Sequence, residues 1–314
     1  MQTMFRPSTR ESAPEVARGG HYMAQPALYP ARDRAARRLE SAILRTRAYF
    51  SIFGYTPTLC ELHRYLHGET ATIEQVRAAC RRLDPRPRSH RSFPETVVPG
   101  HASPPAAGRR RFSLTVLKYL PFVRMIGLTG SRAVQPEGEG DTDLMIVAAS
   151  GRVWLCRLAA VALARFVRHF GDNLCPNYVI AEDSLILGEM SIYDAHELAQ
   201  LRPLYGRAFY QQLWDRNPRV EDLLPNAHPF PCPHDRLPPG PGFLKRVGEW
   251  ALAGRLGDQI ERWERTRKIA RLRALGVTSP EISLSAEQCK GHFDGHRSRI
   301  LFAYDQRLSR LGGG

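Results

Sequence analysis

Apolar residues recur at helical spacing in the first third of the chain, within residues 35–83. The pattern predicts a first helix that ends near Gly54, where the periodicity stops. Two further helices, over 59–66 and 73–83, are predicted by capping boxes, in which a threonine is followed three residues later by Glu or Gln. These pairs are Thr58 with Glu61 and Thr72 with Gln75.

The middle of the chain changes to short apolar runs, which are typical of buried strands. The run 125–128 leads into a Thr-Gly-Ser turn, and the run 144–148 follows an Asp-Thr-Asp triplet at 141–143. Because side chains alternate across a strand, the two aspartates are expected to point to one face and the threonine to the other. A third strand is predicted at 177–180, so this region has the pattern of a sheet.

Longer apolar segments predict helices around the sheet. The segment 153–167 contains two arginines and is too short to cross a bilayer, so we expect a helix packed on the sheet. Residues 193–224 are predicted to be helical, 243–275 to form one long helix that closes the core, and 283–311 to form a last helix. The apolar stripe of the long helix is Leu244, Val247, Ala251, Leu252, Leu256 and Ile260.

The second half of the long helix carries a basic face. Between residues 255 and 273, seven basic side chains accompany three acidic ones. Such a face could hold nucleic acid or a polyphosphate. The alternative is a solvated helix with internal ion pairs, Glu261 with Arg265 and Glu264 with Lys268.

The turn and the two aspartates predict a specific chemistry. Two neighbouring carboxylates repel each other unless a cation lies between them, and a hard divalent ion such as Mg²⁺ also suits the phosphates of a nucleotide. Gly130 would let the backbone approach a phosphate closely, and Ser131 would add a hydroxyl donor. The sequence therefore predicts a site for a metal ion and a triphosphate.

These residues resemble the signature of the DNA polymerase β-like nucleotidyltransferase superfamily, which is a Gly-Ser turn, a spacer and then Asp-x-Asp on a strand. Gly130, Ser131, Asp141 and Asp143 fall at the matching positions, and the spacer Arg132 to Gly140 has a permitted length. Thr142 departs from the pattern, because the residue between the aspartates is usually apolar. A closer resemblance, to bacterial nucleotidyltransferase-domain proteins, extends from about Ala42 to Leu311.

The resemblance implies an α/β (α+β) core with a mixed sheet and an Mg²⁺-dependent or Mn²⁺-dependent enzyme. It would transfer a nucleoside monophosphate from a nucleoside triphosphate to a hydroxyl and release pyrophosphate. Asp141 and Asp143 would be the catalytic metal ligands, and Gly130, Ser131 and Arg132 would bind the nucleotide. The acceptor stays open among a protein side chain, a nucleic-acid end, a sugar and an antibiotic.

The third carboxylate of the superfamily has no clear counterpart. Asn177 is the residue best placed to face inward on the later strand, and its amide can ligate Mg²⁺ but cannot act as a base. Asp172, Glu182 and Asp183 are substitutes by proximity alone. Two alternatives therefore stay open, a weak or inactive nucleotide-binding regulator and a toxin-antitoxin-like modifier of proteins.

The patterns divide the chain into five regions. They are a disordered tail (1–34), a winged-helix-like domain (35–85), a Pro-rich linker (86–113), the nucleotidyltransferase core (114–204) and a helical C-terminal region (205–314). A winged helix would place its third helix in a DNA groove or dock a protein, and the many prolines after it make a regular wing doubtful.

Composition adds further constraints. Lys and Arg number 45 against 31 Asp and Glu, and the net charge of +14 favours an anionic partner, although a general bias toward Arg, Ala and Pro also explains it. The six cysteines form no Cys-x-x-Cys pair, and His228, Cys232 and His234 match no zinc motif. Without an apolar spanning segment or signal core, a cytoplasmic location and no membrane partner are expected. His196 is interpreted as a helix residue satisfied by a neighbour.

Overall fold

The computed structural model describes residues 31–84, 109–134, 141–231, 242–274, 284–290 and 296–312. At its centre is a five-stranded sheet with the strand order β4-β1-β2-β3-β5. The strands are β1 (Val123–Leu128), β2 (Thr142–Ala148), β3 (Leu174–Ala181), β4 (Arg202–Tyr205) and β5 (Gln288–Lys290). The first three confirm the strands predicted from the apolar runs.

The sheet is mixed, as predicted. β1 runs antiparallel to β2 and β4, β2 runs parallel to β3, and β3 runs antiparallel to β5. Two edge strands correct the predictions, because β4 lies in the stretch 193–224 and β5 in the stretch 283–311, both predicted to be helical. Each is at most four residues long and pairs with a distant segment, so no local period marks it.

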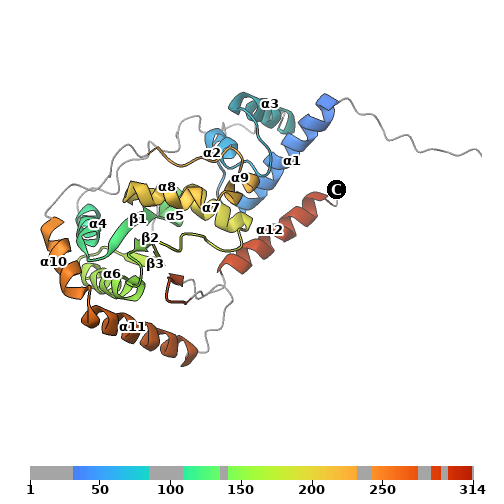
Figure 1. Ribbon diagram of the computed structural model, residues 1–314. Coiled ribbons are helices and arrows are strands. Elements are labelled where there is room, and N and C mark those ends of the chain that lie inside the picture. The colour runs from blue at the N-terminus through green and yellow to red at the C-terminus, as the bar shows by residue number, and fades with distance from the viewer. Residues whose placement is uncertain are drawn as a thin grey trace, which may run out of the picture.

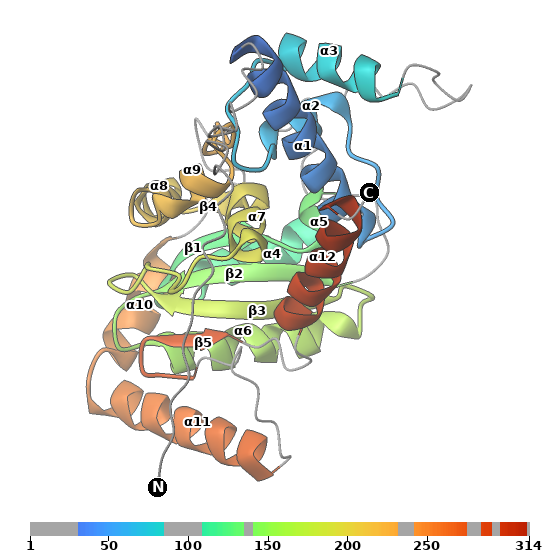
Figure 2. The same cartoon turned by 90° about the vertical axis from the view of Figure 1, so that its right-hand side faces the viewer.

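Helices cover both faces of the sheet (Figures 1 and 2). In chain order they are α4 (Arg109–Tyr119), α5 (Ser131–Val134), α6 (Val153–Arg168), α7 (Ile192–Gln200), α8 (Arg207–Asp215) and α9 (Arg219–Leu223). α6 packs on one face, against Leu144 and Ile146. α7 and α8 pack on the other face, against Met145 and Val147. The helix predicted at 153–167 is therefore confirmed.

Three N-terminal helices confirm the helices predicted within 35–83. They are α1 (Ala31–Ser51), α2 (Leu59–Arg64) and α3 (Ile73–Leu83). Both predicted capping boxes form, since the Thr58 and Thr72 side chains accept the backbone N–H groups of Glu61 and Gln75. The three helices share a small core of their own.

Two predicted boundaries are wrong. α1 begins at Ala31, so the last residues of the predicted tail are helical, and α4 begins at Arg109, inside the predicted linker. The rest of the tail, and residues 86–108 of the linker with the expected wing, lie outside the described residues. Within the described ranges, every helix is too short or too polar to cross a lipid bilayer.

The N-terminal helices pack directly on the rest of the chain. Arg64 of α2 donates a hydrogen bond to the carbonyl of Ala199 in α7 at 3.2 Å, and its guanidinium lies 4.1 Å from the ring centroid of Phe230. A last helix, α12 (His296–Gly312), contacts α1 through a cluster that includes Tyr49 and Ile300 (Figure 2). α1, α7 and α12 are therefore held together.

The long helix predicted at 243–275 is two helices, α10 (Gly242–Leu252) and α11 (Arg255–Ala274). The predicted stripe closes the core only in part. Leu252 and Ile260 pack against a small buried cluster, whereas Leu244, Val247 and Leu256 are 57%, 58% and 57% exposed. The predicted periodicity was correct, but periodicity does not specify which apolar face meets the core.

Two acidic residues of α11 contact α6. Glu261 accepts hydrogen bonds at 2.9 and 2.7 Å from two backbone N–H groups in the first turn of α6. Glu264 is 1% exposed and forms ion pairs with Arg157 of α6 at 3.3 Å and with Arg267 of its own helix at 2.5 Å. These contacts fix α11 on α6, and Glu264 also pairs within its own helix, with a different partner from the predicted Lys268.

Candidate functional site

The predicted turn and the predicted carboxylate meet where β1 and β2 end side by side. The backbone N–H of Thr129 donates to the carbonyl of Asp143 at 2.9 Å, which closes the ladder between the strands. Gly130 follows with φ at +67°, in the left-handed region that favours glycine. A Cβ at Gly130 would lie 2.4 Å from Oδ2 of Asp143, so the glycine leaves room for that carboxylate.

Asp143 is half-buried beside this turn, and Asp141 is exposed. Burial raises the pKa of the Asp143 carboxyl above its usual value, a hydrogen bond from the Cys175 thiol lowers it, and the charge of Asp141 raises it again. The positive charge of Arg132 has a smaller lowering effect on the same pKa. Among the described residues, no Lys or Arg lies within 4.0 Å of either carboxylate as an ion pair.

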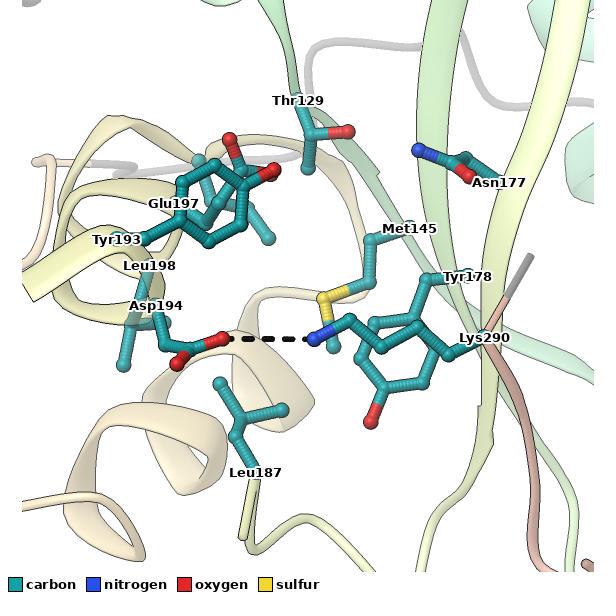
Figure 3. Close-up of a pocket in the computed structure, with 11 residues that line it drawn as sticks. Thr129, Met145, Asn177, Tyr178, Leu187, Tyr193, Asp194, Glu197, Leu198 and Lys290 are labelled. Carbon is teal, nitrogen blue, oxygen red and sulfur yellow. Dashed lines mark hydrogen bonds and ion pairs between the residues drawn. The ribbon is translucent and has the colours of Figure 1, made fainter. Parts of the chain in front are cut away.

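Asn177 lies at an irregularity of β3. Leu144 pairs with Pro176 and Met145 pairs with Tyr178, so Asn177 is an extra residue in the parallel ladder. Such a bulge redirects side chains, and Asn177 lies in the wall of a pocket (Figure 3). The neutral amide of Asn177 is therefore part of this pocket wall, and its role as the third position stays a prediction.

The pocket lies between the sheet and α7. It encloses about 520 Å³, part of it open to solvent. Its walls are Thr129, Met145, Asn177, Tyr178, Leu187, Tyr193, Asp194, Glu197, Leu198, Leu201 and Lys290. Figure 3 shows the ion pair between Asp194 and Lys290, at 3.4 Å, on one side of it. The pocket therefore combines apolar side chains with three charged ones, Asp194, Glu197 and Lys290.

Glu197 of α7 is a second acid in this pocket, and the sequence analysis did not select it. Burial raises the pKa of its carboxyl to about 7; the charge of Lys290 lowers it, and the charge of Asp143 raises it. Asp143, 54 positions away in the chain, is thus among the charges that affect this carboxyl. The only local signal was the capping box of Ser191 with Asp194, which starts α7 and so orients Glu197.

The other substitutes for a third carboxylate lie elsewhere. Glu182 follows the opposite end of β3, where it accepts from the backbone N–H of Ser150 at 3.3 Å and pairs with Arg124 at 3.4 Å. Its neighbour Asp183 is exposed. Asp172 is buried next to the end of α6, with its backbone N–H bonded to the carbonyl of Val167 at 3.2 Å. None of the three lines the pocket.

The remaining site predictions concern metals and histidines. No group of three or more His, Cys, Asp or Glu side chains arranged to hold a metal ion occurs in the described part of the chain. Cys232 and His234 lie outside that part, and the five cysteines within it are free thiols. His196 contacts His67 across 2.9 Å, which confirms that a neighbour satisfies it.

Comparisons with known proteins give no relative. No model of a protein family matches the sequence, and no significant match was found among curated proteins or among solved structures. The functional argument therefore depends on the residues of this chain.

Proposed function

We propose that the chain is a metal-dependent nucleotidyltransferase that transfers a nucleoside monophosphate from a nucleoside triphosphate to a hydroxyl acceptor. The observation that carries this proposal is the packing of the Gly130 turn against Asp143. A left-handed glycine leaves its backbone open to a ligand and keeps a carboxylate beside it. The pocket between the sheet and α7 gives a second reactant room next to that carboxylate.

The residues fit a divalent cation. Asp141 and Asp143 lie two positions apart at the start of one strand, and no described cation pairs with either. Burial is the main cause of the raised pKa of Asp143 and the charge of Asp141 adds to it, and a bound cation would favour the ionised form of both carboxylates. Asp141 and Asp143 would hold Mg²⁺ or Mn²⁺, which when bound offsets the charge of the phosphates. Gly130 and Ser131 would contact phosphate oxygens, and Arg132 would pair with them.

The proposal predicts that Mg²⁺-dependent triphosphate binding needs both aspartates. Asp141→Asn and Asp143→Asn each remove one negative charge and keep the side-chain shape. We expect the affinity for each Mg²⁺-nucleoside triphosphate to fall at least about tenfold, measured by calorimetry, because about 1.4 kcal/mol is lost with the charge. Asp183→Asn, at an exposed position outside the pocket, is the matched control. Unchanged affinity in both site variants would refute the proposal.

A second candidate function is a nucleotide-binding regulator, favoured by the neutral Asn177. Such a protein would bind the triphosphate and release little pyrophosphate. If the amide is the cause, we expect Asn177→Asp to raise either pyrophosphate release or Mg²⁺ affinity, because a carboxylate strengthens a metal site. A native protein that turns over rapidly, with a slower Asp variant, would exclude this candidate.

A further inference from the structure

The pocket contains two acids in different electrostatic environments. Asp194 accepts from Ser191 and forms ion pairs with Lys290 and Arg297 at 3.4 and 2.9 Å. Glu197 lies almost one helical turn further along α7, and no described residue forms a hydrogen bond or an ion pair with its carboxylate. Glu197 is half-buried, and a carboxylate that is partly withdrawn from water without a partner costs free energy, so its presence needs an explanation.

Neighbouring groups restrict what Glu197 can reach. The adjacent His196 contacts His67 on the other side of α7 and is fully hydrogen-bonded within the fold. Glu197 faces the pocket, together with Thr129 from the end of β1 and Asn177 from the bulge of β3 (Figure 3). Side chains two positions apart on a strand share a face, so Asp143 lies on the same face of β2 as the pocket residue Met145, and the transferred phosphoryl group is expected beside it.

We propose that this pocket binds a small hydroxyl-bearing acceptor and that Glu197 accepts the proton of its hydroxyl. The inference rests on the proposed nucleotidyltransferase function and assigns its acceptor site. Met145, Tyr178 and Leu187 give the pocket an apolar and aromatic wall, which suits an acceptor with an apolar face.

The proposed step transfers the nucleoside monophosphate to the acceptor hydroxyl. The acceptor oxygen forms a bond to the α-phosphorus as its proton moves to the Glu197 carboxylate. The bond from the α-phosphorus to the oxygen that bridges to the β-phosphorus breaks, and pyrophosphate leaves with that electron pair. A carboxylate is suited to this role, because it can accept the proton at a fixed position beside the acceptor oxygen.

Glu197→Gln tests the inference, with water and glycerol as probe acceptors and release of pyrophosphate from α-labelled triphosphates as the readout. We expect Mg²⁺-triphosphate affinity within about twofold of wild type and a rate at least about 100-fold lower. An unchanged rate in Glu197→Gln would overturn the inference.

A second variant tests the inference if Glu197→Gln does not fold. Leu187→Phe enlarges a side chain in the pocket wall without altering Glu197, and we expect slower transfer to glycerol with unchanged triphosphate affinity. Wild-type protein that binds Mg²⁺-triphosphate but modifies only a protein partner would overturn the acceptor class and leave the nucleotidyltransferase proposal intact. Wild-type protein that binds no triphosphate would overturn both.

Discussion

Gly130→Ala is expected to reduce Mg²⁺-triphosphate affinity by more than about 100-fold while the protein still folds. The new Cβ would lie 2.4 Å from Oδ2 and 3.1 Å from Cγ of Asp143, so the carboxylate has to move out of its place. The backbone at φ +67° adds strain of about 1 kcal/mol. Calorimetric titration with Mg²⁺ and each triphosphate measures the loss of affinity.

Gly151→Ala is a matched control for the backbone strain. Gly151 has φ at +69°, and a Cβ there would meet nothing within 4 Å. Both variants should therefore lose similar stability in urea unfolding, and only Gly130→Ala should lose nucleotide affinity. A folded Gly130→Ala protein with wild-type affinity would show that the triphosphate does not bind at this turn.

The parts of the fold that sequence predicted correctly are determined by neighbouring residues. The capping boxes at Thr58 and Thr72 close contacts within four positions, so their residue types are sufficient to predict two helix starts. The strands β1 and β2 were also predictable from neighbouring residues, because each is a nearly continuous run of buried residues. The turn at Gly130 and the placement of Asp143 beside it follow from these two strands.

The missed parts depend on contacts between distant segments. β5 is a strand because it pairs with β3, and Glu197 lies at the site because α7 packs on the same face as Met145. The bulge at Asn177 changes the register of β3, which no alternation of residue types reveals. Apolar residues such as Trp250, 83% exposed, show equally that helical periodicity does not determine which face is buried.

A buried histidine pair is expected to make the protein acid-sensitive. Gln200 lies 3.3 Å from Nδ1 of His196, the two Nε2 atoms lie 2.9 Å apart, and Nδ1 of His67 lies 2.7 Å from the hydroxyl of Tyr304. One assignment satisfies every contact with two neutral rings, namely Gln200 to His196, His196 to His67 and His67 to Tyr304 as successive donors. The contact between the Nε2 atoms holds one proton, so an added proton breaks it.

Burial and the charge of Arg45 lower the pKa of His67 from 6.5 to about 3. Burial and the charge of His67 lower the pKa of His196 well below its usual value. The unfolded chain therefore binds protons below about pH 6.5 that the folded chain does not. The contribution of this pair to the free energy of unfolding is fully present above about pH 6.5 and is lost as the pH falls toward 3. The loss is about 1.4 kcal/mol per pH unit for each histidine.

The contribution of the histidine pair to stability is measured by comparing wild type with a variant that carries both His67→Gln and His196→Gln. The amides can still form hydrogen bonds but do not titrate, and Glu197, whose raised pKa opposes acid destabilisation, is common to both proteins. In urea unfolding, the variant should be less stable at pH 8. Between pH 6.5 and pH 5 its disadvantage should shrink by about 3 kcal/mol, because wild type alone loses the two histidine contributions. A constant difference across that range would show that the two rings are protonated equally in the folded and unfolded states.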